Sequence, residues 1–243
     1  MTLLRRGMIA AALAAATVAA PMAVSAGVVV SASGPSAGTF PVGKKIGDSE
    51  RIVLRAGDTL TVLDGDSTRV LRGAGTFTLN QRTATNRRGT FAALTEQRSA
   101  QRMRTGAVRN VPELGPRHSP NLWYIDVGQR GTFCLAGTER VRLWRNSEAG
   151  DATYTLTAAN GDRETVTFAD GEMLAPWDTS VLPVSDDAVY RLSGPGGANT
   201  GELRIAVLDG AADNPEDLAG QLIERGCTQQ LNLLSTALLA NEG

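Results

Sequence analysis

The sequence has one histidine, two cysteines and few aromatic residues, which make up 5% of its 243 positions. Zinc sites need several His or Cys ligands close together, so the single histidine, His118, argues against a metal centre. Ser36 stands in a G-x-S-x-G pattern, but a nucleophile elbow needs a strand before it and a helix after it on an α/β sheet. Pro35 and Pro41 flank it instead. We therefore expect Ser36 in a surface turn, and no catalytic serine, metal or cofactor.

Two further motifs lack the residues that their chemistry needs. The glycine-rich run Gly194–Gly197 has no Lys-Ser/Thr after it, so it does not match a phosphate-binding loop. The stretch Asp64-Gly65-Asp66 lacks the third acid, the following glycine and the distant glutamate of a calcium loop, and is typical of a β-turn.

The N-terminus has the three parts of a secretory signal peptide. Arg5 and Arg6 precede an apolar run from Met8 to Ala20, and small residues lead up to Ala26. We expect cleavage after Ala26 and a periplasmic or secreted protein, with an uncleaved anchor and a twin-arginine signal as alternatives. No later apolar stretch approaches 18 residues, so we expect no transmembrane segment after cleavage.

Export makes the two cysteines, Cys134 and Cys227, candidates for a disulfide bond, because the compartments outside the cytoplasm are oxidising. Two separate buried thiols are the alternative.

Charge is distributed unevenly along the chain. Residues 27–79 carry six basic and five acidic residues, residues 80–132 carry nine and three, and residues 133–243 carry seven and 17. The basic segment around Arg98, Arg102 and Arg104 is predicted to dock onto an acidic protein surface or an anionic envelope component. The alternatives are that it docks onto the acidic part of this chain or is a solvated linker. Export and the scarcity of nearby aromatics argue against nucleic acid.

The pattern of short strands predicts a mainly β fold. Residues 27–79 alternate between apolar and polar positions with Gly and Asp at the corners, which predicts a small β-module. Residues 80–120 are predicted as a linker, with a helix from Thr90 to Gly106 and then a proline-rich stretch.

Residues 121–243 are predicted to form a C-terminal β-sandwich with two terminal helices. A hairpin is expected at Asn160-Gly161. Asn214 precedes Pro215 and two acids, which is typical of a helix start, and Gly226 is typical of a helix end. A second helix is expected after Thr228.

The order of strand, Ala56-Gly57-Asp58, strand, Asp-Gly, strand and Gly73-Ala74-Gly75-Thr76-Phe77 resembles the N-terminal module of exported proteobacterial proteins and, more loosely, FecR-type periplasmic β-domains. The resemblance covers residues 27–79 and implies an accessory or sensing component. FecR proteins also carry a cytoplasmic region and a membrane helix, which this sequence does not match.

One strand of the C-terminal part suggests a binding face. If Val141 and Leu143 face the core, Arg140, Arg142 and Trp144 face outward and form a partner-binding surface, unless the C-terminal helices cover them. We therefore expect a non-enzymatic, partner-binding envelope protein. The alternative is a carbohydrate- or peptidoglycan-active hydrolase that uses acidic residues of the C-terminal part.

Overall fold

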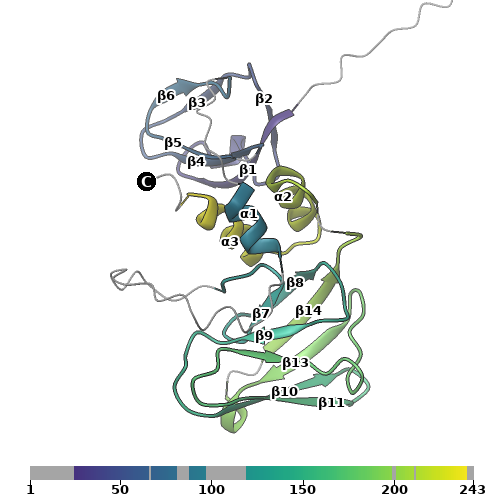
Figure 1. Ribbon diagram of the computed structural model, residues 1–243. Coiled ribbons are helices and arrows are strands. Elements are labelled where there is room, and N and C mark those ends of the chain that lie inside the picture. Colours follow the sequence, from purple (N-terminus) through teal and green to yellow (C-terminus); the bar gives the residue numbers. More distant parts are fainter. Residues whose placement is uncertain are drawn as a thin grey trace, which may run out of the picture.

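The chain folds into two β units with a layer of helices between them (Figure 1). The computed structural model describes residues 25–65, 67–80, 88–96, 119–198, 201–210 and 212–239. The fold is mainly β and ends in two helices, as predicted. Residues 1–24 of the expected signal peptide lie outside the described residues. Within the described ranges, no helix combines the length and apolar character needed to cross a membrane.

The N-terminal β-module consists of short strands that turn at glycine and aspartate corners. One antiparallel sheet has the order β2-β1-β4-β5, and β3 pairs separately with β6. The bounds are β1 (Ser25–Ser33), β2 (Lys45–Gly47), β3 (Ile52–Leu54), β4 (Thr59–Asp64), β5 (Ser67–Arg72) and β6 (Gly75–Phe77). Strand β1 begins two residues before the expected mature N-terminus at Gly27.

Alternation along the strands determines which side chains reach the core of the module. Ile52 and Leu54 are buried on one face of β3, while Val53 on the other face is 55% exposed. Strand β1 is buried on both faces: Val29 belongs to the core of the module, whereas Val28 and Val30 pack against the helices. Because both faces of β1 are covered, this strand is a continuous apolar run.

The C-terminal β unit contains a five-stranded sheet, in the order β11-β10-β13-β14-β8, and a three-stranded sheet, in the order β12-β9-β7. Two neighbouring pairs are parallel, β14 with β8 and β7 with β9. The bounds are β7 (Tyr124–Asp126), β8 (Gly131–Leu135), β9 (Arg142–Trp144), β10 (Ala152–Ala158), β11 (Arg163–Phe168), β12 (Leu174–Pro176), β13 (Val189–Ser193) and β14 (Gly201–Val207).

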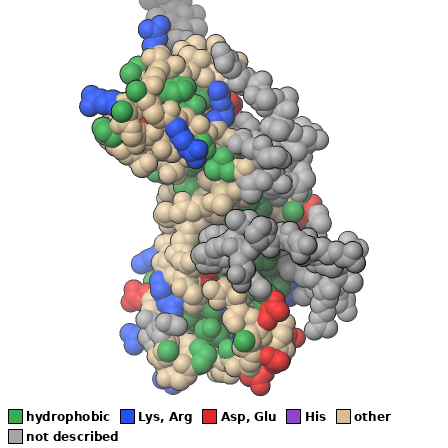
Figure 2. Space-filling view, turned by 90° about the vertical axis from the view of Figure 1, so that its left-hand side faces the viewer, with side chains coloured by type: hydrophobic (Ala, Val, Ile, Leu, Met, Phe, Trp, Pro, Cys, Tyr) green, Lys and Arg blue, Asp and Glu red, His purple; other side chains and the backbone are tan. Residues whose placement is uncertain are grey.

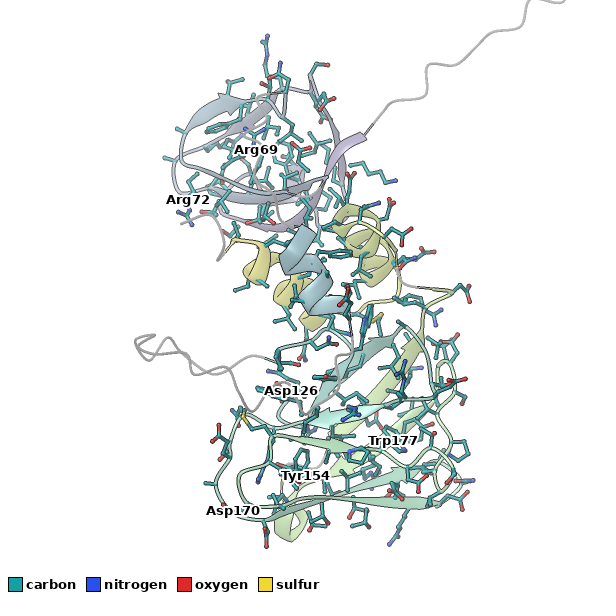
Figure 3. All side chains as sticks on the ribbon, viewed as in Figure 1. Arg69, Arg72, Asp126, Tyr154, Asp170 and Trp177 are labelled. Atoms are coloured by element: carbon teal, nitrogen blue, oxygen red, sulfur yellow. A yellow bond between two sulfur atoms is a disulfide. The ribbon has the colours of Figure 1, made fainter. Side chains whose placement is uncertain are left out.

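The predicted hairpin at Asn160-Gly161 joins β10 to β11. Gly161 adopts φ +93°, a conformation that favours glycine. The two sheets share one apolar core, in which the rings of Trp177 and Tyr190 meet edge to face at 4.8 Å. Figure 3 places Trp177 and Tyr154 within this unit, while Asp170 lies at its periphery.

The two C-terminal helices begin and end where their capping residues predict. Helix α2 (Pro215–Glu224) starts after Asn214, whose side chain accepts a hydrogen bond from the Asp217 N–H at 2.8 Å. Gly226 follows with φ +74° and ends the helix. Helix α3 (Thr228–Leu239) follows immediately.

The linker helix differs from its prediction at its start. Helix α1 spans Arg88–Thr95, so Thr90 lies in its first turn rather than at its N-cap. The expected end at Gly106 falls outside the described residues. Phe91 and Leu94 are buried, as their spacing on one helix face predicts.

The helices share a single core with both β units. The apolar faces of α2 and α3, including Leu222, Leu234 and Leu238, contact Val28, Val30 and Leu63 of the β-module. The same cluster contains Leu122, Trp123 and Ala206 from the C-terminal unit. The predicted boundary at residue 120 therefore lies between the strands of the two β units. The apolar core continues across this boundary, because the terminal helices pack on both units.

The predicted disulfide is confirmed and lies inside this shared core. Cys134 on β8 is bonded to Cys227 between α2 and α3, with their Cα atoms 5.8 Å apart. Both residues are fully buried. The bond links a strand to the turn that joins the two helices, so it holds the helical layer against the C-terminal unit.

Replacing both Cys134 and Cys227 by alanine should strongly destabilise the protein. The bond connects residues 93 positions apart, and the chain-entropy model assigns such a loop about 4–5 kcal/mol of unfolding free energy. Urea unfolding of the oxidised wild-type protein and the double variant measures the difference, with the reduced wild-type protein as a control. Equal midpoints for all three would contradict the proposed role of the bond.

Candidate functional site

The structure corrects the predicted binding face on β9. Trp144 is 3% exposed, so it does not face outward as expected. Strand β9 is the central strand of its sheet, between β12 and β7, and both of its faces are buried. Arg142 is half-buried in register with Tyr124. Arg140 is exposed and lines a hollow of about 560 Å³ together with Thr95 and Trp123.

The arginine that follows β9 has a structural role. Arg145 is 4% exposed, and its guanidinium donates to the carbonyl oxygens of Glu172 at 2.7 Å and Ala169 at 2.9 Å. It also lies over the ring of Phe168, 5.2 Å from the centroid. These contacts attach the end of β9 to the segment between β11 and β12. A charge that is satisfied in this way stabilises the fold and is not offered to a ligand.

Ser36 is part of a turn, as predicted, but it is buried rather than at the surface. It contacts a carboxylate that organises two loops. The Asp58 carboxylate accepts from the Ser36 N–H at 2.9 Å and from the Arg55 N–H at 2.5 Å. Burial alone would raise the pKa of Asp58, but the hydrogen bonds from Ser36 and Arg55 outweigh it and lower the pKa. Gly34 is required beside this group, because a Cβ there would lie 2.5 Å from Asp58 Oδ1.

Several predicted site residues cannot be placed. Arg98, Arg102 and Arg104, and the single histidine, His118, lie outside the described residues. On the face drawn in Figure 2, Lys and Arg side chains lie on the upper lobe and along the left of the lower lobe, while most Asp and Glu side chains gather at the lower right.

A pocket of about 200 Å³ lies where α3 meets β7 and β8, and we call it the α3 pocket. Apolar side chains from three segments line it: Leu122, Tyr124, Phe133 and Leu233. Polar side chains also line it: Asp126, Gln129, Gln229, Asn232 and Thr236. In Figure 3, Asp126 lies at the side of the C-terminal unit that faces the helices. The pocket combines an apolar lining with convergent polar groups, which is typical of a binding site.

Helix α3 contributes to this pocket through a second face. Leu231, Leu234 and Leu238 point into the shared core. Residues at the spacing i, i+3, i+4 and i+7 form another stripe, which lines the pocket: Gln229, Asn232, Leu233 and Thr236. Since the leucine face anchors the helix, the orientation of the polar stripe is determined by the core.

Gln230 closes the free edge of β8. Its Oε1 accepts from the Cys134 N–H at 2.6 Å, and its Nε2 donates to the carbonyl oxygens of Cys134 at 2.7 Å and Leu122 at 2.6 Å. One side-chain amide thus replaces the hydrogen bonds that a neighbouring strand would make. Gln230 is 4% exposed, and these bonds account for both of its polar atoms.

The neighbouring Gln229 is satisfied at one end only. Its Nε2 donates to the Arg130 carbonyl oxygen at 2.6 Å, which fixes the orientation of the amide. Its Oε1 is buried and accepts no hydrogen bond from any residue that the structure describes. An acceptor in this state costs about 1–3 kcal/mol. The Gln229 side chain is therefore held in the wall of the α3 pocket by one hydrogen bond, with its oxygen buried inside the protein.

The electrostatics of the α3 pocket are mild. Burial raises the pKa of Tyr124, an effect that the nearby Arg142 partly offsets, so the phenol stays protonated at neutral pH. Among the described residues that line the pocket, Asp126 is the one acidic side chain, and its carboxylate accepts from the Gly128 N–H at 2.8 Å. The pocket thus combines hydrogen-bonding groups with one acidic side chain.

A second hollow of about 560 Å³ lies between α2 and the β-module, lined by Glu216, Lys45, Asp217 and Gln221 among others. Glu216 Oε2 accepts from the Gly65 N–H of the β4–β5 turn at 3.2 Å. Burial raises the pKa of Glu216; the Gly65 N–H opposes this rise, and the charges of Asp217 and Asp64 add to it. The carboxyl therefore bridges the helical layer and the β-module.

Sequence reasoning did not identify the α3 pocket. The segment Gln229-Gln230-Leu231-Asn232 was predicted as part of the second terminal helix, with no site assigned to it. The sequence feature that could have indicated the pocket is a pair of amide residues, Gln229 and Gln230, which stand near Cys227 at the start of an apolar helix. Across the ranges that the structure describes, no group of three or more His, Cys, Asp or Glu residues is arranged to hold a metal ion.

Replacing Gln230 by leucine should lower the unfolding free energy by about 3 kcal/mol or more. The change leaves a buried N–H and two buried carbonyl oxygens without this partner, and each unsatisfied group costs about 1–3 kcal/mol. Urea unfolding measures the loss. The matched control is Gln129→Leu, at an exposed position of the same pocket, which should stay within about 0.5 kcal/mol. Equal effects of both variants would contradict the edge-capping role.

Glu216 should make the protein less stable as the pH rises. Its pKa is raised above the ordinary value of 4.5 in the folded state, so the folded protein binds the proton more tightly than the unfolded chain. The stabilisation is present below pH 4.5 and is lost as the pH rises through the folded-state pKa. Glu216→Gln should flatten this part of the stability profile in urea unfolding between pH 4 and 7. An unchanged slope would contradict the assignment, and Glu224→Gln is the control.

Comparisons of the chain with protein-family models, with curated proteins and with solved structures found no match. The resemblance of residues 27–79 to FecR-type modules therefore stays a prediction.

Proposed function

We propose that the protein is a non-enzymatic exported protein that binds a protein partner through the α3 pocket. Export is supported by the Cys134–Cys227 bond, because disulfides persist in oxidising compartments such as the periplasm or the extracellular space. The expected signal peptide is consistent with this, and the FecR resemblance adds an accessory or sensing role in the envelope.

The observation that supports binding is the composition of the pocket wall. Its polar groups are amides, hydroxyls and one carboxylate, arranged around apolar side chains. General acid–base catalysis is most efficient with a side chain whose pKa lies near the working pH. Here the raised pKa of Tyr124 keeps the phenol neutral beside a single acid, Asp126. These groups are suited to recognition through hydrogen bonds and apolar contact.

One observation favours the alternative, a hydrolase that acts on carbohydrate or peptidoglycan. Glu216 combines partial burial, a raised pKa and a position in a hollow, which are the properties of a catalytic acid. Its hydrogen bond to the Gly65 N–H supplies a structural reason for the same burial. Release of soluble fragments from purified peptidoglycan by the wild-type protein, but not by Glu216→Gln, would favour the hydrolase.

Photocrosslinking tests the binding proposal. A photoreactive phenylalanine analogue in place of Asn232, at the exposed rim of the pocket, should crosslink to a protein partner in the cell envelope. The same analogue at Asn146, an exposed position in the loop after β9, is the matched control. The additional change Thr236→Trp, which places a large ring at the pocket, should abolish the Asn232 adduct. An adduct that persists with Thr236→Trp, or that forms equally from Asn146, would contradict the proposal.

A further inference from the structure

We infer that the outward face of the five-stranded sheet binds an acidic polysaccharide through Arg163 and Arg191, with threonine hydroxyls between and beside them. This surface is separate from the α3 pocket, so the inference goes beyond the proposed function. The class of ligand is an extended sugar chain that carries a carboxylate on every second unit.

One face of the five-stranded sheet is apolar and the other is polar. Leu156, Val166 and Leu192 point into the core that this sheet shares with the three-stranded sheet. Because successive side chains of a strand point to opposite faces, the residues that alternate with them point outward. We call the outward residues of three neighbouring strands the arginine–threonine face: Thr153, Thr155 and Thr157 on β10, Arg163, Thr165 and Thr167 on β11, and Arg191 on β13.

The helical layer leaves the arginine–threonine face uncovered. On the same side of the sheet, Cys134 on β8 and Ala206 on β14 pack in the shared core beneath the helices. Further across the sheet, Arg163, Thr165 and Arg191 are exposed. In Figure 1, β10 and β11 lie at the end of the C-terminal unit that is farthest from the helices. The sheet therefore presents an exposed polar surface at this end.

The register of the strands places two arginines in one row across the sheet. Thr157 pairs with Arg163 on one side and with Arg191 on the other. Since neighbouring strands lie about 4.8 Å apart, the two arginines arise roughly 10 Å from each other. Thr155 and Thr165 form the next row. Threonine hydroxyls thus lie between the two guanidinium groups and beside them.

These two arginines stand out in a part of the chain that is otherwise acidic. Residues 133–243 carry seven basic and 17 acidic residues. Arg145 and Arg225 are occupied within the protein, by backbone carbonyl oxygens and by Asp186 respectively. By contrast, the side chains of Arg163 and Arg191 make no hydrogen bond or ion pair with any residue that the structure describes. Their charges are therefore available to an anionic ligand.

The neighbouring strand β14 adds one charge of each sign to this side of the sheet. Glu202 pairs with Arg191 in the register, and Arg204 lies two residues further along the same face. The Arg204 guanidinium donates to the Asp187 carbonyl oxygen at 3.4 Å. Since these two charges offset each other, the net positive charge of the surface is that of Arg163 and Arg191.

The composition of the arginine–threonine face selects among anionic partners. Protein interfaces have an apolar centre, and single-stranded nucleic acids stack on aromatic rings. Polybasic segments that bind anionic membranes carry four to eight Lys or Arg residues. The outward positions of β10 and β11 provide none of these, because they hold threonine and one arginine.

The same composition is complementary to a sugar chain with carboxylates. A guanidinium binds a carboxylate through two parallel hydrogen bonds, and a threonine hydroxyl both donates and accepts. Uronic acids supply the carboxylates and sugar rings supply hydroxyls. Two units of an extended sugar chain span a length similar to the separation of Arg163 and Arg191. Alternating uronic acids can therefore reach both arginines while the sugar between them lies over Thr157.

The test is a titration of the full disulfide-bonded protein, observed through its threonine methyl groups by NMR. The probe is a hexasaccharide of hyaluronan, in which glucuronic acid alternates with N-acetylglucosamine. It should shift the methyl signals of Thr155, Thr157 and Thr165. The neutral control is the hexasaccharide of N-acetylglucosamine, which should bind at least roughly tenfold more weakly. Binding of hyaluronan should also weaken at high salt, because the Debye length falls from about 10 Å at 0.1 M to about 3 Å at 1 M.

Variants of the protein supply the second arm. Arg163→Gln and Arg191→Gln each remove one exposed charge and should weaken binding of the hyaluronan hexasaccharide roughly threefold, and the double variant roughly tenfold. The matched control is Arg140→Gln, which removes an exposed charge from the same unit but away from this face. It should bind within about twofold of the wild-type protein.

Two further probes represent the other anionic partners: a hexaglutamate peptide and vesicles of phosphatidylglycerol. Binding of either probe as tightly as hyaluronan would overturn the inference. So would equal binding of the neutral hexasaccharide, no threonine methyl shifts, or a double variant that binds like the wild-type protein. The proposed function is decided separately, by whether Thr236→Trp removes the crosslink from Asn232 at the α3 pocket.

Discussion

The fold depends on a layer of helices that has to bury apolar surface on two sides. The β-module is small, and Val28, Val30 and Leu63 project from its sheet away from its own core. Helices α2 and α3 cover these side chains and also contact the C-terminal unit, where the Cys134–Cys227 bond holds the turn between them. Each fully buried aliphatic side chain contributes about 1.5–3 kcal/mol. The shared cluster therefore joins the two β units, which are formed by separate stretches of the chain, through one core.

The position of α3 leads directly to the candidate site. Its leucine face is held by the shared core, so its amide face must lie against the edge of β8. Gln230 then serves as the missing neighbour of that edge and protects it from pairing with other chains. Gln229 and Leu233 lie on the same side and line the α3 pocket. The site is thus a consequence of how the helix is anchored, with polar groups carried on rigid elements.

Predictions based on local pattern succeeded where one face of an element is buried and the other is solvated. The alternation of Ile52, Val53 and Leu54 is an example. The same reasoning was wrong for Trp144, because β9 is a central strand with both faces covered. A strand of three residues cannot reveal by its own sequence whether a second layer covers it. The candidate site was also missed, since its amides resemble the ordinary polar face of a helix.

What the sequence by itself determined is local: the cap at Asn214, the helix end at Gly226, the hairpin at Asn160-Gly161 and the pairing of the two cysteines. The cap, the helix end and the hairpin depend on residues that are close together in the chain. The disulfide could be predicted because each of the two cysteines has a single possible partner. Only the tertiary structure decided that the terminal helices lie between the β units. It also decided that Gln230 caps Cys134 across 96 residues and that Glu216 meets Gly65 across 151. Contacts at such separations depend on packing of the whole chain, which spacing along the sequence does not encode.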